Sequence, residues 1–367
     1  MDLLTALTLA VGLVLLVVGG ELLVRGGSGL GRALGLSPLI VGLTIVAAAT
    51  SAPELAVSLD ATLSGAPGLA VGNVVGSNIV NILLVLGLAA VVLPMTVRTQ
   101  LVRTDVPVMV ALSVLLLVLA LDGSVGRLEG GLLVAVFVAY VAWTVVVGRR
   151  AGVGDPSPQA APPAAPRPLV DVVLVVVGVA LLVLGARLLV TAATDVAAAF
   201  GVSDLVIGLT VVAVGTSLPE LATSVIAAVR GEREMAIGNV VGSNIFNITA
   251  VMGLTAAIAP GGVPVQAAVL RFDLPVMVAV AVALVPVVFT GFTIARWEAG
   301  VFLAYFVAYV AYLLLAAADH DALPAYSAVM LGFVVPITVL TLAVLVAYEI
   351  GLRRGGRQEH DQLSPPG

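Results

Sequence analysis

The sequence contains no cysteine and no lysine, and each absence excludes a class of function. Without cysteine, the chain cannot form disulfides, thiolate metal sites or a cysteine nucleophile. All 16 basic residues are arginine, so the chain lacks the lysine of a Walker-type phosphate loop and the amine of a retinal Schiff base. Neither ATP bound in such a loop nor light absorbed by retinal can therefore drive the protein.

Charge of either sign is also scarce. Charged residues make up 10% of the chain, whereas 61% of its residues are hydrophobic and its mean hydropathy is +1.21. The formal net charge of −5 is thinly spread and predicts no nucleic-acid partner. Runs of about 20 apolar residues, long enough to span a bilayer as helices, recur without the alternation of a membrane β-barrel. We therefore expect an all-α polytopic membrane protein with lipid around it.

Eleven hydrophobic runs predict eleven spanning helices. The first run lacks the basic start and the cleavage site of a signal peptide, so we expect it to be retained as a helix. After the fifth run, residues 149–168 are rich in proline and alanine and predict a short cytoplasmic linker. The runs lie at about residues 4–24, 37–63, 68–94, 105–121, 130–148, 169–190, 204–229, 234–258, 274–290, 297–316 and 325–349.

The arginines favour one orientation of these helices. If the N-terminus lies outside, thirteen arginines fall in cytoplasmic segments and only Arg127, Arg187 and Arg271 fall on the other side. Cytoplasmic loops of membrane proteins carry such an excess of positive charge. We therefore expect a multi-pass protein of the cell membrane, plasma or inner, with an external N-terminus and a cytoplasmic C-terminus.

The chain also repeats itself at a spacing of about 166 residues. VGLTIVAAATSAPELAVS (41–58) matches IGLTVVAVGTSLPELATS (207–224), and AVGNVVGSNIVNI (70–82) matches AIGNVVGSNIFNI (236–248). Because each copy holds five spans, an odd number, the second copy should enter the membrane from the opposite face. Inverted repeats of this kind are typical of transporters, with the substrate site at the repeat interface near the membrane midplane.

The repeats predict a ten-helix core of two inverted five-helix repeats plus an eleventh, C-terminal helix. The expected segments are a first repeat at 1–148 with its motifs at about 41–87, the linker at 149–168, a second repeat at 169–317 with its motifs at about 207–253, the extra helix at 318–350 and a cytoplasmic tail at 351–367.

A proline and a glutamate interrupt the second span in ATSAPE, which ends at Glu54, and the seventh in GTSLPE, which ends at Glu220. Pro53 cannot donate a backbone hydrogen bond and clashes with the carbonyl of Ala49, so we expect a bend or break that frees carbonyls from Ala47 onward. Freed carbonyls inside a membrane need a partner, and a cation can be that partner.

Oxygen-bearing side chains gather around both breaks. In the third span Asn73, Ser77 and Asn81 recur every four residues, which places them on one helical face, and Asn78 lies next to that face. All are hard oxygen donors, which suit Na⁺ or Ca²⁺ and argue against Zn²⁺ and copper. The candidates are Thr50, Ser51 and Glu54 at the first break, Thr216, Ser217 and Glu220 at the second, Asn73, Ser77, Asn78 and Asn81 in the third span, and Asn239, Ser243, Asn244 and Asn247 in the eighth.

Structural roles compete with ligation for several of these residues. An intramembrane carboxylate indicates function by default, so Glu54 and Glu220 are the strongest candidates. Ser58 and Ser224 are expected to bond back to their own helices. Helix packing is expected for the small residues of the GNVVG segments, Gly72, Gly76, Gly238 and Gly242. Interhelical hydrogen bonding and ligation both stay open for Asn73, Asn78, Asn239 and Asn244.

Other charged residues are expected to be ordinary. Glu21 has Arg25 one turn further along the first span, so an interfacial ion pair is expected there. Asp105 and Asp273 fall near span ends and are expected at the membrane interface. His320 lies between the tenth and eleventh spans and is expected in a surface loop.

The paired blocks GLTxxAxxTSxPEL and GNVVGSNIxNI resemble the two α-repeats of the calcium/cation antiporters, the sodium/calcium exchanger superfamily, in its prokaryotic form. Both blocks occur in both halves at the same internal spacing, and the similarity covers about residues 1–317. The resemblance implies a cage of cation sites built by spans 2, 3, 7 and 8. It also implies that spans 1 and 6 slide across the other helices to alternate access.

Residue matching to that family implies a set of cation ligands. They are the carbonyls of Ala47 and Ala213 and the side chains of Thr50, Ser51, Glu54, Ser77, Asn81, Thr216, Ser217, Glu220, Ser243 and Asn247. Some prokaryotic relatives carry aspartate at the position of Asn247, so the amide leaves two carboxylates in this site. The linker is too short for the calcium-sensing domains of animal exchangers, and we expect no such regulation.

Two carboxylates in a low dielectric are costly when no cation neutralises them. We therefore expect a secondary active antiporter that exchanges Ca²⁺ for Na⁺ by alternating access, exports Ca²⁺, needs no cofactor, is not an enzyme and works as a monomer. Exchange driven by H⁺ or dependent on K⁺ is the nearest alternative, since the glutamates could also bind protons, and a cation channel is a more distant one.

Overall fold

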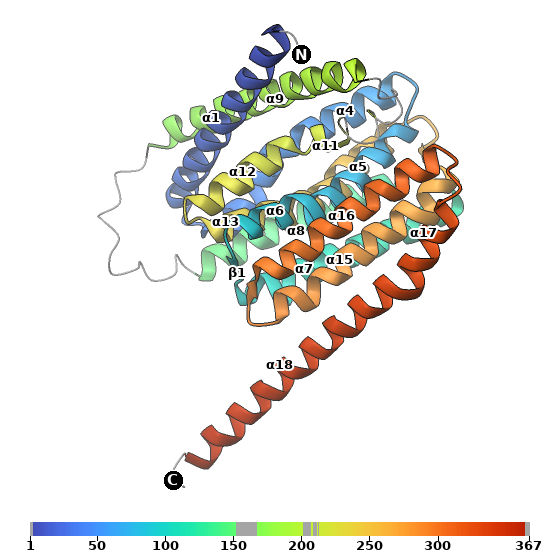
Figure 1. The fold of residues 1–367 in the computed structure, drawn as a ribbon. Helices are drawn as coiled ribbons and strands as arrows, with labels where there is room; N and C mark the ends of the chain where they lie inside the picture. The colour runs from blue at the N-terminus through green and yellow to red at the C-terminus, as the bar shows by residue number, and fades with distance from the viewer. Residues whose placement is uncertain (1–2, 152–166, 201–206, 208–210, 212, 364–367) are drawn as a thin grey trace.

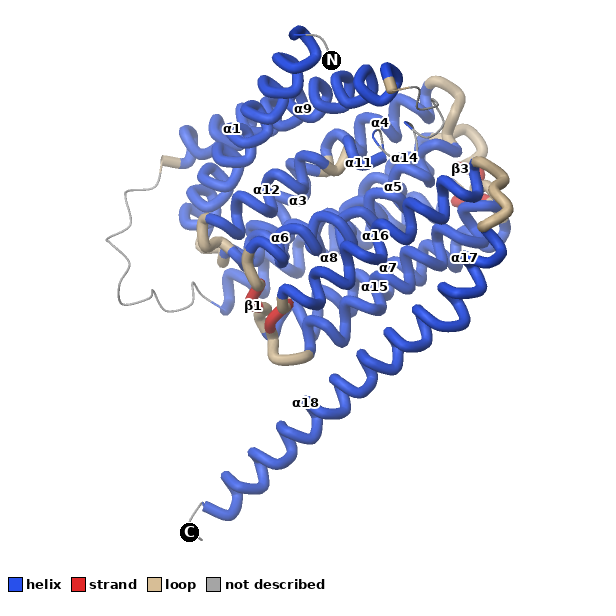
Figure 2. Tube along the Cα trace, in the orientation of Figure 1, coloured by secondary structure: helices blue, strands red, loops and turns tan. Residues whose placement is uncertain are grey.

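The computed structural model describes residues 3–151, 167–200, 207, 211 and 213–363 (Figures 1 and 2). Long helices lie side by side in one bundle, and a C-terminal helix projects away from it (Figure 1). The described strands are four two-residue segments. The predicted all-α polytopic fold is confirmed.

The first half begins with α1 (Leu3–Leu34) and a broken second span. That span consists of α2 (Pro38–Val41), the π-helical segment η1 (Gly42–Val46), α3 (Ala47–Thr50) and α4 (Ala52–Leu63). The remaining elements are α5 (Gly68–Val80), η2 (Asn81–Leu86), α6 (Gly87–Val92), β1 (Met95–Thr96), η3 (Leu101–Asp105), α7 (Val106–Leu119), η4 (Ala120–Asp122), β2 (Ser124–Val125) and α8 (Arg127–Ala151).

The second half repeats this succession of elements. Its described elements are α9 (Pro168–Ala199), α11 (Ala213–Gly215), α12 (Leu218–Val229), α13 (Arg233–Phe246), η6 (Asn247–Val251), α14 (Met252–Ile258), β3 (Val263–Pro264), η7 (Val269–Asp273), α15 (Leu274–Phe289), β4 (Thr293–Ile294) and α16 (Arg296–Ala317). The chain ends with α17 (Leu323–Val329), η8 (Met330–Val334) and α18 (Val335–Leu363).

Ten of the eleven predicted spans are present in the described residues. Nine helices there are long and apolar enough to cross a membrane, and the pair Pro38–Thr50 and Ala52–Leu63, bent by 40°, makes a tenth span. The predicted seventh span, 204–229, lies partly outside the described residues, which include its second part as α12. The greater part of the predicted linker, 152–166, also lies outside them.

The spans Gly68–Val92 and Arg233–Ile258 form the centre of the bundle. The most apolar stretch of each is 78% buried, against 39% or less for the other single-helix spans. Their inner faces carry the asparagine and serine residues of the two GNVVGSN motifs. The polar residues of the sequence repeat therefore lie in the core of the protein rather than toward lipid.

Small residues let α1 and α9 cross closely along the edge of the bundle (Figure 1). A Cβ atom placed on Gly19 would lie 2.8 Å from the carbonyl oxygen of Gly178, and one on Gly12 would lie 3.0 Å from that of Gly185. Any larger residue at these positions would push the two helices apart.

Two short β-ribbons join the halves at opposite ends of the bundle (Figure 2). β1 pairs with β4, and β2 pairs with β3, so each ribbon takes one strand from each half. The arginine that follows each ribbon bonds to carbonyls of the other half: Arg127 donates to Ala257, and Arg296 donates to Val91. These equivalent arginines therefore lie at opposite ends of the bundle.

Candidate cation site

The break in the second span lies where the proline motif predicts it. α3 ends at Thr50, Ser51 leaves helical geometry with φ −86° and ψ 4°, and Pro53 lies in the first turn of α4. Proline is favoured in a first turn, because its missing N–H would have no partner there. The carbonyl of Ala47, however, accepts the Ser51 N–H at 2.9 Å and lies 3.4 Å from the Thr50 hydroxyl, so it is not freed in the way expected.

Residues of the two halves meet directly at this break. The hydroxyl of Ser51 donates to Oε1 of Glu220 at 3.1 Å. The hydroxyl of Thr50 lies 3.2 Å from Oδ1 of Asn239 and 3.4 Å from the hydroxyl of Ser243. Four residues predicted as cation ligands are thus brought together from segments 169 and 193 residues apart in the chain.

The two glutamates are fully buried. Glu54 and Glu220 are both 0% exposed, and they stand in the first turns of α4 and α12, the matching helices that follow the two breaks. Helix N-termini favour negative charge, which stabilises both carboxylates there. Neither side chain points outward to lipid.

Many oxygens of this cluster have no hydrogen-bond partner among the residues that the structure describes. Buried polar atoms are nearly always bonded, so a group of unpaired acceptors indicates a place for a cation. The unpaired atoms on predicted ligands are Oε1 and Oε2 of Glu54, Oε2 of Glu220, Oγ of Ser217, Oδ1 of Asn81 and Oδ1 of Asn247.

The other predicted ligands lie in the same region. Ser77 in α5 and Ser243 in α13 are buried at matching positions, one turn before Asn81 and Asn247. Thr216 is half-buried between α11 and α12. Ala213 is the first residue of α11, and its side chain lies outside the described part.

Asn73 and Asn239 hold the broken spans in place. The amide of Asn73 donates to the carbonyl of Glu54 at 3.0 Å and to the hydroxyl of Ser58 at 2.9 Å. In the other half, the amide of Asn239 donates to the hydroxyl of Ser224 at 3.0 Å. Both asparagines therefore make interhelical hydrogen bonds, and each serine accepts a bond from another helix, which the expected back-bonding did not include.

The two GNVVG motifs differ in their surroundings. A Cβ atom on Gly238 would lie 2.6 Å from the carbonyl of Leu39, and one on Gly242 would lie 2.7 Å from the backbone of Leu43. The predicted packing role is confirmed for these two glycines, which let α13 approach η1 and α2. At Gly72 and Gly76 no described atom beyond the chain neighbours and the helix's own backbone lies within 4 Å of such a Cβ.

The charged residues outside the candidate site are paired or buried in ways that the sequence analysis did not predict. Glu21 forms an ion pair with Arg230 rather than with Arg25, which links α1 to the end of α12. Asp105 is 0% exposed and accepts a hydrogen bond from Tyr140 at 3.1 Å, so it is packed inside the protein and bonded there. The matching pair, Tyr309 and Asp273, has a hydrogen bond of 2.8 Å.

Sequence reasoning missed these aspartate–tyrosine pairs, although it held a signal for them. The same aspartate recurs in LVRTDVPVMV and VLRFDLPVMV, and the same tyrosine recurs in FVAYVAW and FVAYVAY. Because the two partners are 35 or 36 residues apart, the motifs alone do not show that they meet.

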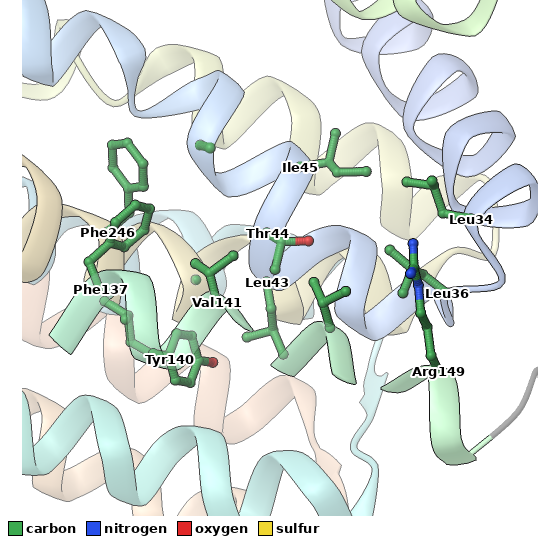
Figure 3. Close-up of a pocket in the computed structure, with 14 residues that line it drawn as sticks. Leu34, Leu36, Leu43, Thr44, Ile45, Phe137, Tyr140, Val141, Arg149 and Phe246 are labelled. Atoms are coloured by element: carbon green, nitrogen blue, oxygen red, sulfur yellow. The ribbon is translucent and has the colours of Figure 1, made fainter. Parts of the chain in front are cut away.

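An apolar cavity of about 300 Å³ lies beside the site, between the end of α1, η1, α8 and α13 (Figure 3). Phe137 and Phe246 lie at one end of it and Arg149 lies at the other (Figure 3). The hydroxyl of Thr44 is bonded to the carbonyl of Ile40 at 2.6 Å. The cavity thus offers no group of oxygen atoms that could bind a cation, and it is distinct from the candidate cation site.

The donor set of the candidate site is poor in formal charge. In the described part of the chain, no three histidine, aspartate or glutamate side chains come close enough to hold a metal ion. A cation bound here would meet the carboxylates of Glu54 and Glu220 and otherwise neutral hydroxyl, amide and carbonyl oxygens. Such oxygen sites suit Na⁺ and Ca²⁺.

The chain matches known proteins over most of its length. Residues 4–146 and 170–315 match the family described as "Sodium/calcium exchanger protein". A putative antiporter, CaxA from Alkalimonas amylolytica, is 41% identical over 277 residues, which are 75% of this chain and 86% of CaxA. The sodium/calcium exchanger MaX1 from Methanosarcina acetivorans is 35% identical over 343 residues, 84% of this chain and 97% of MaX1.

Solved structures show the same fold. The sodium-calcium exchanger NCX_Mj, soaked without Na⁺ and Ca²⁺, superposes with a TM-score of 0.72 at 32% sequence identity. The match covers 85% of this chain and 100% of the NCX_Mj chain. The family match stops at residue 315, so α17 and α18 lie beyond it.

Proposed function

Because the chain belongs to the sodium/calcium exchanger family, we propose that it is a secondary active antiporter that exchanges Ca²⁺ for Na⁺ across the cell membrane and exports Ca²⁺. The observation that carries this proposal is the pair of buried carboxylates, Glu54 and Glu220. Within the described part of the chain, oxygens of both, and other buried oxygens of both halves, have no hydrogen-bond partner. The cations are substrates, and no cofactor or enzymatic step is involved.

The proposed ligands are those that the sequence motifs predict. They are Ala47, Thr50, Ser51, Glu54, Ser77, Asn81, Ala213, Thr216, Ser217, Glu220, Ser243 and Asn247. The contacts of Ser51 with Glu220 and of Thr50 with Ser243 support a single site shared by both halves.

Exchange follows from the charge of this site. When it is empty, two negative charges lie in a low dielectric, and moving them through a closed state is costly. One Ca²⁺ or two Na⁺ would cancel that charge, so the loaded protein can change conformation and the empty one cannot do so readily. Any net charge moved per cycle would gain about 2.3 kcal/mol per 100 mV of membrane potential.

The proposed orientation has the N-terminus outside and the C-terminus in the cytoplasm. It rests on the arginine asymmetry and is consistent with the equivalent Arg127 and Arg296 at opposite ends of the bundle. We further propose that the two five-helix halves are inverted repeats and that the protein works as a monomer.

Flux in proteoliposomes tests the proposal. Vesicles loaded with Na⁺ should take up ⁴⁵Ca²⁺ when diluted into Na⁺-free medium, and uptake should vanish when Na⁺ is equal on both sides. Ca²⁺ uptake driven by a pH gradient in place of the Na⁺ gradient would indicate H⁺-driven exchange. Ca²⁺ uptake that requires K⁺ would indicate K⁺-dependent exchange. Ca²⁺ flux without any counter-ion would indicate a channel.

Two substitutions test the proposed site within the same assay. Glu54→Gln and Glu220→Gln should each lower Na⁺-driven Ca²⁺ uptake about tenfold or more, which requires a loss of only about 1.4 kcal/mol in binding. Asp105→Asn is the matched control, since it also removes a buried carboxylate but keeps an acceptor for Tyr140. Normal exchange by either glutamine variant would show that the site is assigned wrongly.

A further inference from the structure

Four asparagine side chains form hydrogen bonds between the two halves, and two of them, Asn81 and Asn247, are proposed ligands. The amide nitrogen of Asn81 donates to Oδ1 of Asn244 at 3.1 Å, and the amide nitrogen of Asn247 donates to Oδ1 of Asn78 at 3.2 Å. All four side chains are buried, with at most 2% exposed. Each half therefore supplies one acceptor to an asparagine of the other half.

The orientation of the two rear asparagines, Asn78 and Asn244, is itself fixed by their other hydrogen bonds. The amide nitrogen of Asn244 donates to the thioether sulfur of Met109 at 3.5 Å, and that of Asn78 donates to the sulfur of Met277 at 3.6 Å. A thioether accepts hydrogen bonds and has none to donate. If either amide were turned over, its oxygen would face the sulfur and its NH₂ group would face another NH₂ group.

This arrangement decides which atom of Asn81 and Asn247 faces the site. Because their NH₂ groups point to Asn244 and Asn78, their Oδ1 atoms are left without a partner among the described residues. A carbonyl oxygen can bind a cation, whereas an NH₂ group would repel it. Asn81 and Asn247 also begin the π-helical segments η2 and η6, which are frequent at functional sites.

We propose that Asn78 and Asn244 are positioning residues that hold the amides of Asn81 and Asn247 with their oxygens toward the transported cation. They act through those two asparagines, because their own Oδ1 atoms face the amide nitrogens of Asn81 and Asn247. The proposal deepens the cation site and rests on the proposed function. The same chain of asparagine, asparagine and methionine occurs twice, and each copy crosses from one half to the other and back.

A double-mutant cycle separates orientation from simple packing. Asn244→Leu removes the acceptor, so the amide of Asn81 can turn, and the Ca²⁺ concentration for half-maximal exchange should rise about tenfold or more, as at other metal sites whose outer partners are lost. Adding Asn81→Asp to the Asn244→Leu variant should return the half-maximal Ca²⁺ concentration toward its wild-type value, because a carboxylate presents an oxygen in either orientation. In the wild-type background, Asn81→Asp should change the half-maximal Ca²⁺ concentration by a smaller factor than it does in the Asn244→Leu background. The reason is that one oxygen of the new carboxylate would then face Oδ1 of Asn244.

The second half supplies a matched repeat of this cycle with Asn78→Leu and Asn247→Asp. Thr249→Val is the control, because the buried hydroxyl of Thr249 bonds to the carbonyl of Ile245 in its own helix, at 2.5 Å; it should leave half-maximal exchange unchanged. If the leucine variants do not fold, Met109→Leu and Met277→Leu replace them, with a smaller shift in the same direction.

Ca²⁺-dependent thermal stabilisation in detergent provides a readout that does not need transport. If Ca²⁺ neither stabilises the wild-type protein nor is transported by it, the proposed function is overturned. If the wild type binds and transports Ca²⁺, the positioning role is overturned when Asn244→Leu and Asn78→Leu leave half-maximal exchange unchanged. It is also overturned when each aspartate substitution shifts affinity by the same factor in both backgrounds.

Discussion

At the scale of single residues, the hydrogen bond between Tyr140 and Asp105 stabilises a carboxyl group that lies outside the proposed ligand set. Asp105 is fully buried, and its second oxygen, Oδ2, has no partner among the described residues. A buried carboxyl group that loses its donor is left with the full cost of desolvation. The pair joins η3 to α8, so it ties the fourth and fifth spans together.

Removing the hydroxyl of Tyr140, in the first half, should therefore destabilise the protein more than removing that of Tyr309, in the second half. We expect Tyr140→Phe to lower the free energy of unfolding by about 1 kcal/mol. Tyr309→Phe should cost less, because its partner Asp273 is only half-buried. Thermal unfolding in detergent measures both, and a larger loss for Tyr309→Phe would contradict the burial argument.

The sequence predicts the charged members of the proposed site but does not orient its neutral ones. Glu54 and Glu220 are conspicuous because a carboxylate in an apolar run is costly. Asn78 and Asn244 are as polar as Asn81 and Asn247 and lie in the same motif, so composition does not distinguish ligand from support. The difference depends on which atom of each amide faces inward, and that is set by Met109 and Met277 from other helices.

At the scale of elements, the break at Ser51 shapes the candidate site. It sets α3 and α4 at an angle, so that Thr50 and Ser51 reach α13 and α12 respectively. Proline and the apolar run together predict this break. The π-helical segments η2 and η6 were not predicted, because the phase shift of a π turn leaves no visible trace among residues that are nearly all apolar.

Restoring an N–H group at the break should impair exchange without unfolding the protein. We expect Pro53→Ala to favour a continuous helix through Ser51, because the alanine that replaces the proline can donate its N–H to the carbonyl of Ala49, and to lower Na⁺-driven Ca²⁺ uptake. Pro286→Ala, within α15 and away from the site, should retain uptake. Equal losses in both variants would mean that the break has no special role.

The close crossing of α1 and α9 makes a second prediction for an element. A methyl group on Gly19 would lie 2.8 Å from two backbone atoms of α9, closer than packing allows, so Gly19→Ala should separate the helices and lower both the unfolding temperature and uptake. Gly131→Ala is the matched control, because no described atom lies within 4 Å of that position. Fluorescence-detected thermal unfolding and ⁴⁵Ca²⁺ flux measure the two effects.

At the scale of the whole molecule, the repeat in the sequence predicts the matching succession of elements in the two halves. Hydrophobic runs locate the spans because each must be about 20 residues long to cross a bilayer, but they underestimate α1, which continues to Leu34, and α9, which continues to Ala199. Glycine and arginine after residue 24 of α1, and threonine and Asp195 after residue 190 of α9, lower the local hydropathy without ending either helix. The cross-half ribbons could not be predicted, since two-residue strands carry no pattern.

The C-terminal helices stand apart from the core that the exchanger family shares. None of the residues of α17 and η8 is buried, and the apolar stretch of the last span is 0% buried. The segment contacts the core through Tyr305, which donates to Thr338 at 2.7 Å, and through Tyr326, which donates to the carbonyl of Ala308 at 2.8 Å. These bonds join the C-terminal segment to α16, which carries none of the proposed ligands.

A chain that ends after Ala317 should therefore keep its Na⁺-driven Ca²⁺ uptake. All proposed ligands precede that residue, and NCX_Mj is matched over 100% of its length by 85% of this chain. Loss of the two tyrosine contacts should lower the unfolding temperature modestly. ⁴⁵Ca²⁺ flux, normalised to folded protein by size-exclusion chromatography, measures the outcome. A folded but inactive truncation would show that α17 and α18 take part in transport, because packing against the core would then be needed for the conformational change.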